Sequence, residues 1–294
     1  MIRRKIYRLK LSSRTLTLGE RTLIMGVLNV TPDSFSDGSK FLDPTTAIEH
    51  GLVMERAGAN LLDIGGESTR PGSSATPAQE ELARILPVLR GLRGVLKIPI
   101  SIDTQKFEVA EAALDAGAEL INDISGLKAD ARLAQLAARR RVPLILMHMR
   151  GEPRTMQKSG FARHVMKDVL GGLRRSVVAA RKAGVAKSQI ILDPGIGFGK
   201  SFSQNYELLE RLPQLARLGY PLLVGTSRKA FLGATLAREG KPAQPEQRIW
   251  GTAATVTASI LNGAHIVRVH DVSEIVQVAR VADCLVNPRL RRSL

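Results

Sequence analysis

Residues 23–29, LIMGVLN, show the pattern that decides the fold of this chain. The run is apolar up to Asn29, and a loop rich in Pro, Asp, Ser and Gly follows it. A short apolar run bounded by turn residues is typical of a strand that is buried on both faces. The pattern recurs in NLLDIGGEST (60–69), IPISIDT (98–104), ELINDIS (119–125), PLILMHM (143–149), IILDPG (190–195), PLLVGTSRK (221–229) and HIVRVHD (265–271).

Segments of helical character and length separate these eight runs. Strands that alternate with helices predict a parallel α/β sheet, and eight such units predict a closed (β/α)8 barrel, the TIM barrel. Active sites of such barrels lie where the strands end and the following loops begin. The polar residues at those ends form the candidate rim: Asn29, Thr69, Asp103, Asn122, His148, Asp193, Lys229, Arg268 and His270.

The chain of 294 residues fits a single domain, because no Pro- or Ser-rich linker divides it. We expect an N-terminal β-hairpin within residues 1–20, the barrel over 21–287 and a basic tail over 288–294. Residues 5–19 alternate apolar and polar positions around Ser12 and Ser13, which indicates two short strands. This hairpin is expected to close the lower end of the barrel.

Capping signals predict where several helices begin and end. The first barrel helix is expected from Thr45 to Ala57, with Gly58 as its C-cap. Thr76 is expected to cap the second helix, with Pro77 at its first helical position. Three later glycines are expected in the left-handed conformation just after helices: Gly117, Gly184 and Gly219.

Composition limits the classes of function. The formal net charge is +16, but aromatic residues make up only 4% of the chain and no nucleic-acid-binding motif occurs, so we do not expect nucleic acid as a partner. The charge suits an acidic substrate without identifying one. No apolar stretch approaches the ~18 residues that a membrane span needs, and we expect a cytoplasmic protein without a membrane partner. The single cysteine, Cys284, excludes an internal disulfide.

The segment DPGIGFGKS (193–201) resembles a nucleotide-binding loop but does not fit one. A Walker motif requires glycine where Pro194 stands, and a dinucleotide fingerprint requires its last glycine deeper in a helix than Gly199. The glycines instead allow the backbone to approach a flat ligand closely, and Phe198 offers it an aromatic face.

Three strand ends carry hydrogen-bonding groups for one pocket. Asp103, Asn122 and Asp193 end neighbouring strands and are flanked by apolar residues. One such aspartate alone could be a helix N-cap, whereas the three together suit a ligand with a row of N–H donors, such as the edge of a pterin or purine. Lys229 adds a donor for a carbonyl oxygen.

A second set at the first, second and last strands suits a phosphate or diphosphate, because it combines guanidinium, imidazole, hydroxyl and amide groups. An oxygen ligand such as Asn29 also suits Mg²⁺ that bridges phosphates. This set is Asn29, Thr69, Arg70, Arg268 and His270.

Two further features are less specific. His148 is interpreted either as a rim residue or, more simply, as a packing and loop-support residue. Ser227, Arg228 and Lys229 are expected to open a helix whose free N–H groups attract a carboxylate or phosphate. No His, Cys or carboxylate set has zinc-binding spacing.

The chain resembles the dihydropteroate synthase family from Met25 to Val272. GVLNVTPDSFSDG, DIGGESTRPG, SIDT, NDISG, LMHMRGEPRTMQ, DPGIGFGK, GTSRKAFLG and RVHDV follow the order of the family at similar spacings. The resemblance implies a transferase that joins 6-hydroxymethyl-7,8-dihydropterin diphosphate to p-aminobenzoate. The products would be 7,8-dihydropteroate and pyrophosphate.

The resemblance also implies roles for individual residues. Asp193 would accept from the 2-amino and N3 hydrogens, Lys229 would face O4 and N5, and Arg268 would stack on the pterin ring. Asp103 and Asn122 would complete the pterin edge. The diphosphate would be bound by His270, Thr69 and Arg70, and Mg²⁺ by Asn29. The p-aminobenzoate carboxylate would be bound by Ser227, and its ring would pack on Phe35, Pro71 and Phe198.

The family mechanism would begin with ionisation of the C–O bond. Arg70 and His270 would stabilise the leaving diphosphate with Mg²⁺, while Asp103 and Asp193 would stabilise the pterin methylene cation. The resemblance further implies a homodimer, formed through late helices such as 247–262.

The departures from the family pattern are small. Gln105 and Phe107 follow SIDT where Ser and Pro are more frequent, and Ile196 replaces a frequent Phe. Two rival hypotheses are a methyltetrahydrofolate-type pterin methyltransferase, which needs no diphosphate clamp, and a non-catalytic pterin-binding paralogue.

Overall fold

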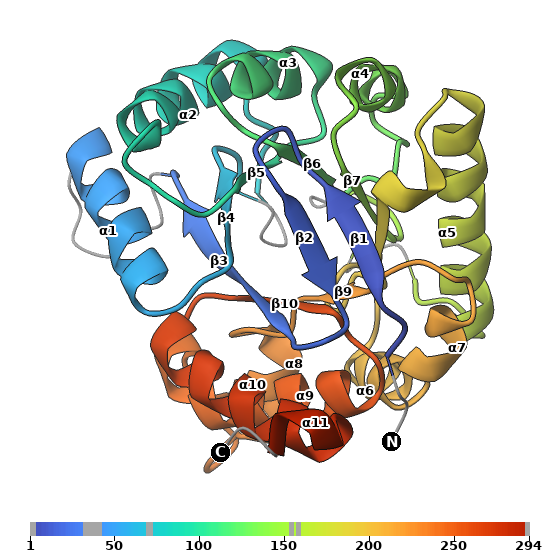
Figure 1. Ribbon diagram of the computed structural model, residues 1–294. Coiled ribbons are helices and arrows are strands. Elements are labelled where there is room, and N and C mark those ends of the chain that lie inside the picture. The colour runs from blue at the N-terminus through green and yellow to red at the C-terminus, as the bar shows by residue number, and fades with distance from the viewer. Residues whose placement is uncertain (1–3, 32–42, 69–72, 153–155, 157–159, 292–294) are drawn as a thin grey trace.

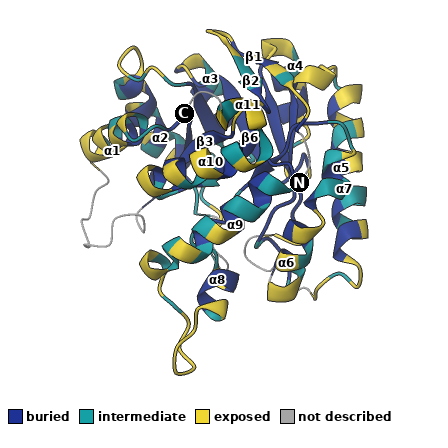
Figure 2. Cartoon of the chain, turned by 60° about the horizontal axis from the view of Figure 1, so that its bottom comes forward, coloured by how far each residue is buried: buried dark blue, intermediate teal, exposed yellow. Residues whose placement is uncertain are grey.

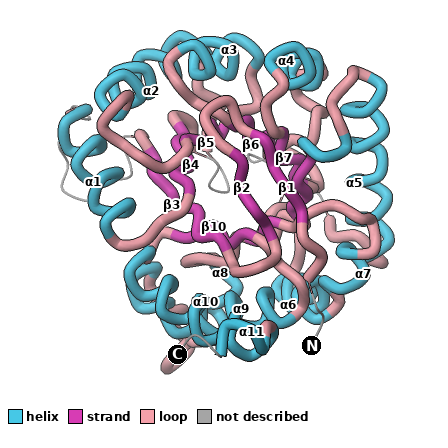
Figure 3. The backbone as a smooth tube through the Cα atoms, in the orientation of Figure 1, coloured by secondary structure: helices cyan, strands magenta, loops and turns pink. Residues whose placement is uncertain are grey.

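The structure is a computed structural model that describes residues 4–31, 43–68, 73–152, 156 and 160–291 (Figure 1). Eight strands form one parallel sheet in the order β8-β7-β6-β5-β4-β3-β10-β9. A parallel bridge between Leu192 and Leu222 joins the two edges. The predicted (β/α)8 barrel is therefore confirmed, with the strands as a central ring inside the helices (Figure 3).

The barrel strands are short, as expected for runs buried on both faces. Their bounds are β3 (Leu23–Asn29), β4 (Leu61–Gly65), β5 (Ile100–Asp103), β6 (Leu120–Asp123), β7 (Leu144–Met147), β8 (Ile190–Asp193), β9 (Leu223–Val224) and β10 (Ile266–Val269).

The helices lie between the strands in the chain and cover the outside of the barrel. Their apolar faces pack on the strands and their polar faces are exposed (Figure 2). The α-helices are α1 (Pro44–Arg56), α2 (Ala78–Leu92), α3 (Phe107–Asp115), α4 (Arg132–Arg140), α5 (Val165–Lys182), α6 (Phe202–Glu210), α7 (Leu212–Ala216), α8 (Ala230–Thr235), α9 (Ile249–Leu261), α10 (Val272–Val286) and α11 (Pro288–Arg291). Two 3₁₀ helices, η2 (Lys187–Gln189) and η3 (Pro245–Arg248), complete the described elements.

The predicted hairpin consists of β1 (Tyr7–Lys10) and β2 (Thr15–Leu18), paired in antiparallel register. Leu9, Leu11 and Leu18 are buried in one cluster with the inward side chains near the start of the barrel strands, among them Met25 and Leu61. The hairpin thus fills the lower end of the barrel, and polar chemistry is left to the opposite end.

The start of the chain is anchored to the last long helix. Arg4 Nη2 lies 2.6 Å from Asp283 Oδ1, and both side chains are buried. The Thr22 N–H and hydroxyl also donate to Asp283, at 2.7 Å each. This network lies beside the first residues of β3, far from the carboxyl ends of the strands.

Most predicted helix ends are confirmed within a residue. Gly58, Gly117, Gly184 and Gly219 all have positive φ. The prediction that Thr76 caps α2 is wrong: Pro77 is the N-cap, with extended backbone (ψ 147°), and the helix begins at Ala78. The Thr76 N–H instead donates to Glu67 Oε1 at 2.8 Å.

The helix after β9 also begins later than predicted. Lys229 is its N-cap, so Ser227 and Arg228 precede the helix, and Arg228 has φ 58°. Among the helices that the structure describes, none is long and apolar enough to cross a membrane.

Candidate active site at the carboxyl ends of the strands

The strand register brings three predicted rim residues, Asn29, Asp103 and Asn122, to one level. Asp193 lies two residues farther along its strand, because Asn122 is level with Ile145 and Ile191. Asn29 pairs with Gly65, Gly65 with Asp103, and Asp103 with Asn122, while Met147 pairs with Asp193 farther round the ring. Neighbouring strand ends thus present their side chains at the same end of the barrel.

Asp193 and Lys229 form the charged part of the predicted pterin edge. Asp193 accepts the Gly195 N–H at 2.6 Å, and its burial raises the pKa of this carboxyl to about 6. Burial, together with the charge of Arg268, lowers the pKa of Lys229 to about 8, against the opposing charges of Asp193 and Asp103. A carboxyl group and an amine whose pKa values are both shifted toward neutral pH suit a flat ligand that carries N–H and carbonyl groups.

Phe198 and Lys229 are in direct contact. The Lys229 Nζ lies 4.1 Å from the centroid of the Phe198 ring, a cation–π distance. Phe198 also belongs to a small apolar cluster with Ile124, Met147 and Met149, separate from the main core. This cluster offers an apolar wall beside the polar strand ends, as ligand pockets commonly have.

Arg268 is held by two carboxylates. Its Nε donates to Asp63 Oδ2 at 2.6 Å and its Nη2 to Asp103 Oδ2 at 2.7 Å. Asn122 Nδ2 donates to the same Asp63 oxygen at 2.9 Å. Burial disfavours the charge of Arg268, but the neighbouring carboxylates more than offset it and raise its pKa. Burial raises the pKa of Asp103, and Arg268 opposes that shift.

Asp63 was not among the predicted site residues. It is fully buried in the middle of β4, where its Oδ1 has no hydrogen-bond partner among the described residues. The available signal was a carboxylate inside the apolar run NLLDIGG, where an acid is rarely found unpaired. It joins Arg268 and Asn122, two predicted ligand contacts, through one oxygen.

His270 and Ser227 lie together. The Ser227 hydroxyl oxygen accepts the backbone N–H of His270 at 3.2 Å and lies 3.1 Å from the ring nitrogen Nδ1 of His270. Burial, reinforced by Arg268 and Arg228, lowers the pKa of His270 to about 3. The imidazole is therefore neutral near pH 7, and a neutral imidazole can donate one hydrogen bond through its ring N–H.

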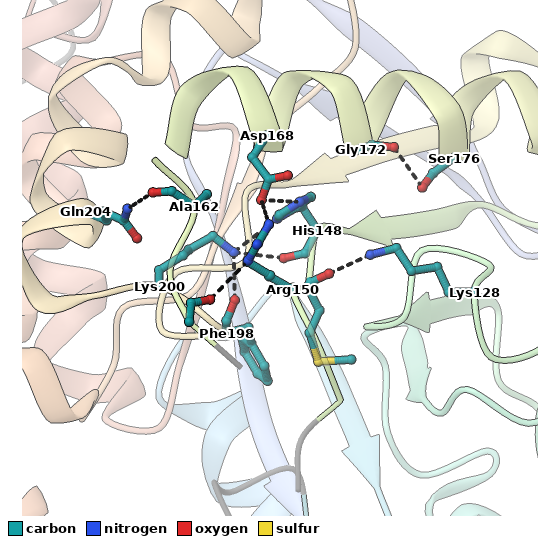
Figure 4. Close-up of polar contacts among 12 residues, drawn as sticks. Lys128, His148, Arg150, Ala162, Asp168, Gly172, Ser176, Phe198, Lys200 and Gln204 are labelled. Atoms are coloured by element: carbon teal, nitrogen blue, oxygen red, sulfur yellow. Dashed lines mark hydrogen bonds and ion pairs between the residues drawn. The ribbon is translucent and has the colours of Figure 1, made fainter. Parts of the chain in front are cut away.

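His148 is buried, and its position favours the loop-support interpretation. Burial and nearby cations lower the pKa of its imidazole to about 2. Lys200 Nζ lies 3.2 Å from its Nδ1 (Figure 4). Lys200 was not predicted as a site residue. In the sequence it is simply a lysine near the end of a glycine-rich loop, and no neighbouring residue indicates that it is buried.

Mg²⁺ is compatible with the donor groups of the rim. Asn29, at the end of β3, is partly exposed, and its side chain carries an amide oxygen. Within the described ranges, no three His, Cys, Asp or Glu side chains gather as a metal-binding group. A single protein oxygen suits Mg²⁺, which usually keeps several waters and shares phosphate oxygens with a substrate.

The loops above the rim line a partly open cavity of about 580 Å³, and the predicted pterin contacts are not among its lining residues. Its walls include Glu67, Gln105, Ser125 and Met149, from the loops after β4, β5, β6 and β7. Four predicted substrate contacts lie outside the described residues: Phe35, Thr69, Arg70 and Pro71.

Comparison with known proteins agrees with this geometry. A family described as pterin binding enzyme matches residues 25–270. The dihydropteroate synthase of Synechocystis sp. is 49% identical over 272 residues, 91% of each chain. The Xanthomonas albilineans dihydropteroate synthase with 4-aminobenzoic acid aligns with a TM-score of 0.87 and 42% identity, over 96% of this chain and 98% of that chain. The same enzyme in complex with 7,8-dihydropteroate aligns with a TM-score of 0.84 and 41% identity, over 95% and 98%.

Proposed function

Since this chain belongs to the dihydropteroate synthase family of pterin-binding enzymes, we propose that its barrel joins 6-hydroxymethyl-7,8-dihydropterin diphosphate to p-aminobenzoate. The products are 7,8-dihydropteroate and pyrophosphate. The observation that carries this proposal is the convergence of Asp103, Asn122, Asp193 and Lys229 at one end of the barrel, beside Arg268 and His270.

The hydrogen-bonding edge of the pterin is bound by side chains of opposite charge. The Asp193 carboxylate accepts from the 2-amino and N3 hydrogens, and the Lys229 amine donates to O4 and faces N5. Asp103 and Asn122 complete the edge. Arg268, fixed by Asp63 and Asp103, stacks its planar guanidinium on the ring.

The diphosphate is bound beside the first and last strands. The neutral His270 imidazole donates to a phosphate oxygen, and Thr69 and Arg70 add a hydroxyl and a guanidinium. Asn29 would hold Mg²⁺ through its amide oxygen. When bound, the ion neutralises charge on the leaving diphosphate.

The arylamine approaches from the loop after β9. The buried Ser227 hydroxyl, fixed by His270, receives the p-aminobenzoate carboxylate. Phe35, Pro71 and Phe198 pack on its ring.

The reaction follows from these positions. The bond between the pterin methylene and the diphosphate oxygen breaks, and the electron pair leaves with pyrophosphate. The carboxylates of Asp103 and Asp193 stabilise the methylene cation electrostatically, and the low-dielectric site strengthens this effect. The arylamine nitrogen then bonds to the methylene carbon and loses a proton.

The test is a turnover assay with both substrates and Mg²⁺. Pyrophosphate release that requires p-aminobenzoate supports the proposal, and its absence from folded protein contradicts it. Asp103→Asn tests the electrostatic role separately: turnover is expected to fall while pterin binding persists. An unchanged rate with intact binding would exclude that role for Asp103.

Three further proposals concern the protein as a whole. We propose a single domain over 1–294, a cytoplasmic location and a homodimer formed through α9. The dimer is supported by Trp250, which is 78% exposed on that helix. Light scattering of the wild type and Trp250→Glu tests it, with a monomeric wild type as the contradicting result.

A further inference from the structure

The loops that follow β7 and β8 lie backbone against backbone. The His148 N–H donates to the Asp193 carbonyl at 3.0 Å. A Cβ on Gly195 would lie 2.0 Å from the His148 carbonyl oxygen, and one on Gly199 would lie 2.2 Å from that of Arg150. Both glycines also have φ +66°. The close approach therefore requires glycine at these positions.

The Lys200 amine joins the two loops from within (Figure 4). Its Nζ donates to the His148 carbonyl at 3.0 Å and to the Phe198 carbonyl at 2.9 Å, and it lies 3.2 Å from His148 Nδ1. The Lys200 amine thus has three polar partners, two of which are carbonyl oxygens that can only accept. Lys200 is only 2% exposed, and a lysine is rarely that buried unless it is paired.

The His148 ring is held in place beside this amine. A Cβ on Gly172 of α5 would lie 2.4 Å from His148 Cδ2, so that glycine leaves the space in which the ring sits. The other ring nitrogen, Nε2, faces Asp168 Oδ2 at 3.7 Å, and a tautomer with its proton on Nε2 would leave Nδ1 free to accept from Lys200. The ring is thus part of the support for Lys200.

Phe198 connects this support to the pterin site. Its carbonyl is bound by Lys200, and its ring lies under the Lys229 amine at 4.1 Å. Gly197 lies alongside the Lys229 stem, where a Cβ would come within 3.1 Å of Lys229 Cδ. The contacts therefore run from the Lys200 amine through the Phe198 backbone to Lys229.

We propose that Lys200 is a positioning residue for pterin recognition: it holds the Phe198 backbone so that the ring supports the Lys229 amine against the pterin. This inference rests on the proposed function, because it concerns the pterin-reading side of that site. It predicts a larger effect on the pterin substrate than on the arylamine, because Phe198 is only one of three side chains proposed to pack on the arylamine ring, whose carboxylate is received at Ser227.

Lys128 offers a matched control. Its Nζ donates to the Met149 carbonyl at 2.5 Å, so it too binds a backbone oxygen of the loop after β7. Unlike Lys200, it makes no hydrogen bond to Phe198 among the described residues. A general loosening of this loop would affect both lysine variants alike, whereas the proposed role affects Lys200 alone.

The experiment measures pyrophosphate release with each substrate varied in turn. We expect Lys200→Met to raise KM for the pterin diphosphate about tenfold, since small misplacements in a site have large kinetic effects. Its KM for p-aminobenzoate is expected to rise less than its KM for the pterin diphosphate, because Phe35, Pro71 and Ser227 still hold the arylamine. Both KM values of Lys128→Met are expected to stay within about twofold, because that change leaves Phe198 in place. A folded Lys200→Met with the wild-type pterin KM would overturn the proposal, as would an equal effect of Lys128→Met.

A double-mutant cycle tests the route through Phe198. In a Phe198→Leu background, Lys200→Met is expected to change the pterin KM less than about twofold, because the ring that it positions is gone. A full tenfold effect in that background would contradict the route.

If Lys200→Met does not fold, Lys200→Gln takes its place. Its amide keeps two N–H donors, and the expected pterin KM lies between those of the wild type and a full loss, while a wild-type KM would contradict the role. Wild-type turnover separates the two hypotheses: an inactive folded wild type contradicts the proposed function, and an active wild type with unaffected Lys200 variants contradicts only this inference.

Discussion

Asp63→Asn tests whether the buried charge network prepares the pterin site. The Asp63 Oδ2 oxygen accepts from Arg268 at 2.6 Å and from Asn122 at 2.9 Å, so one carboxylate orients two predicted pterin contacts. The amide keeps the shape of the side chain and one acceptor, but it removes the charge that fixes the guanidinium.

The size of the effect follows from the partners that remain. Removing one partner of a buried ion pair costs about 3–5 kcal/mol. Arg268 keeps Asp103 at 2.7 Å, so we expect the lower end of that range. About 3 kcal/mol corresponds to a decrease in kcat/KM for the pterin diphosphate on the order of 100-fold.

The assay is steady-state pyrophosphate release, accompanied by thermal unfolding. Asp283→Asn is the matched control, because Asp283 is also a buried carboxylate paired with an arginine, Arg4, at 2.6 Å. The control is expected to lower the unfolding temperature and leave kcat/KM unchanged. A folded Asp63→Asn protein within threefold of the wild-type kcat/KM would refute the reasoning, since an effect near 3 kcal/mol is about 100-fold.

Three other perturbations have definite expected outcomes. The kcat/KM for the pterin diphosphate is expected to rise with pH through about 6, as Asp193 becomes charged, and to fall above about 8, as Lys229 loses its proton; a flat profile from pH 5 to 9 would contradict both roles. Gly172→Ala places a methyl group 2.4 Å from His148 Cδ2, and urea unfolding is expected to show a loss of about 1–3 kcal/mol rather than no change. Leu9→Ala leaves a cavity in the lower end of the barrel, and a loss of about 2–5 kcal/mol is expected in the same assay, whereas a loss below about 1 kcal/mol would argue against the hairpin as a packed plug.

The barrel could be predicted because its strands are buried on both faces. Such strands are continuous apolar runs with polar residues at or close to their ends, and the register places Asp103 and Asn122 side by side. The hairpin was equally visible, because its alternation around Ser12 and Ser13 matches a strand pair with one buried face. Patterns of this kind involve only residues close together in the chain, so they can be recognised from a single sequence.

The parts that were missed depend on contacts between distant segments. Lys200 is recognisable only through the carbonyls of Phe198 and His148, and His148 is 52 residues away. Asp63 was visible as an acid inside an apolar strand, but its partners lie on β6 and β10. The prediction that Thr76 caps α2 was wrong because Pro77 has an extended ψ and is itself the N-cap. The Thr76 N–H binds Glu67, nine residues earlier, and the residues around Thr76 do not indicate this contact.

The most direct test of the central claim is a crystal structure of this protein with the pterin diphosphate and Mg²⁺. The account predicts the 2-amino and N3 edge of the pterin on Asp193, O4 on Lys229, and the diphosphate beside His270. A pterin bound elsewhere, or bound with its N–H edge turned away from Asp193, would contradict the account.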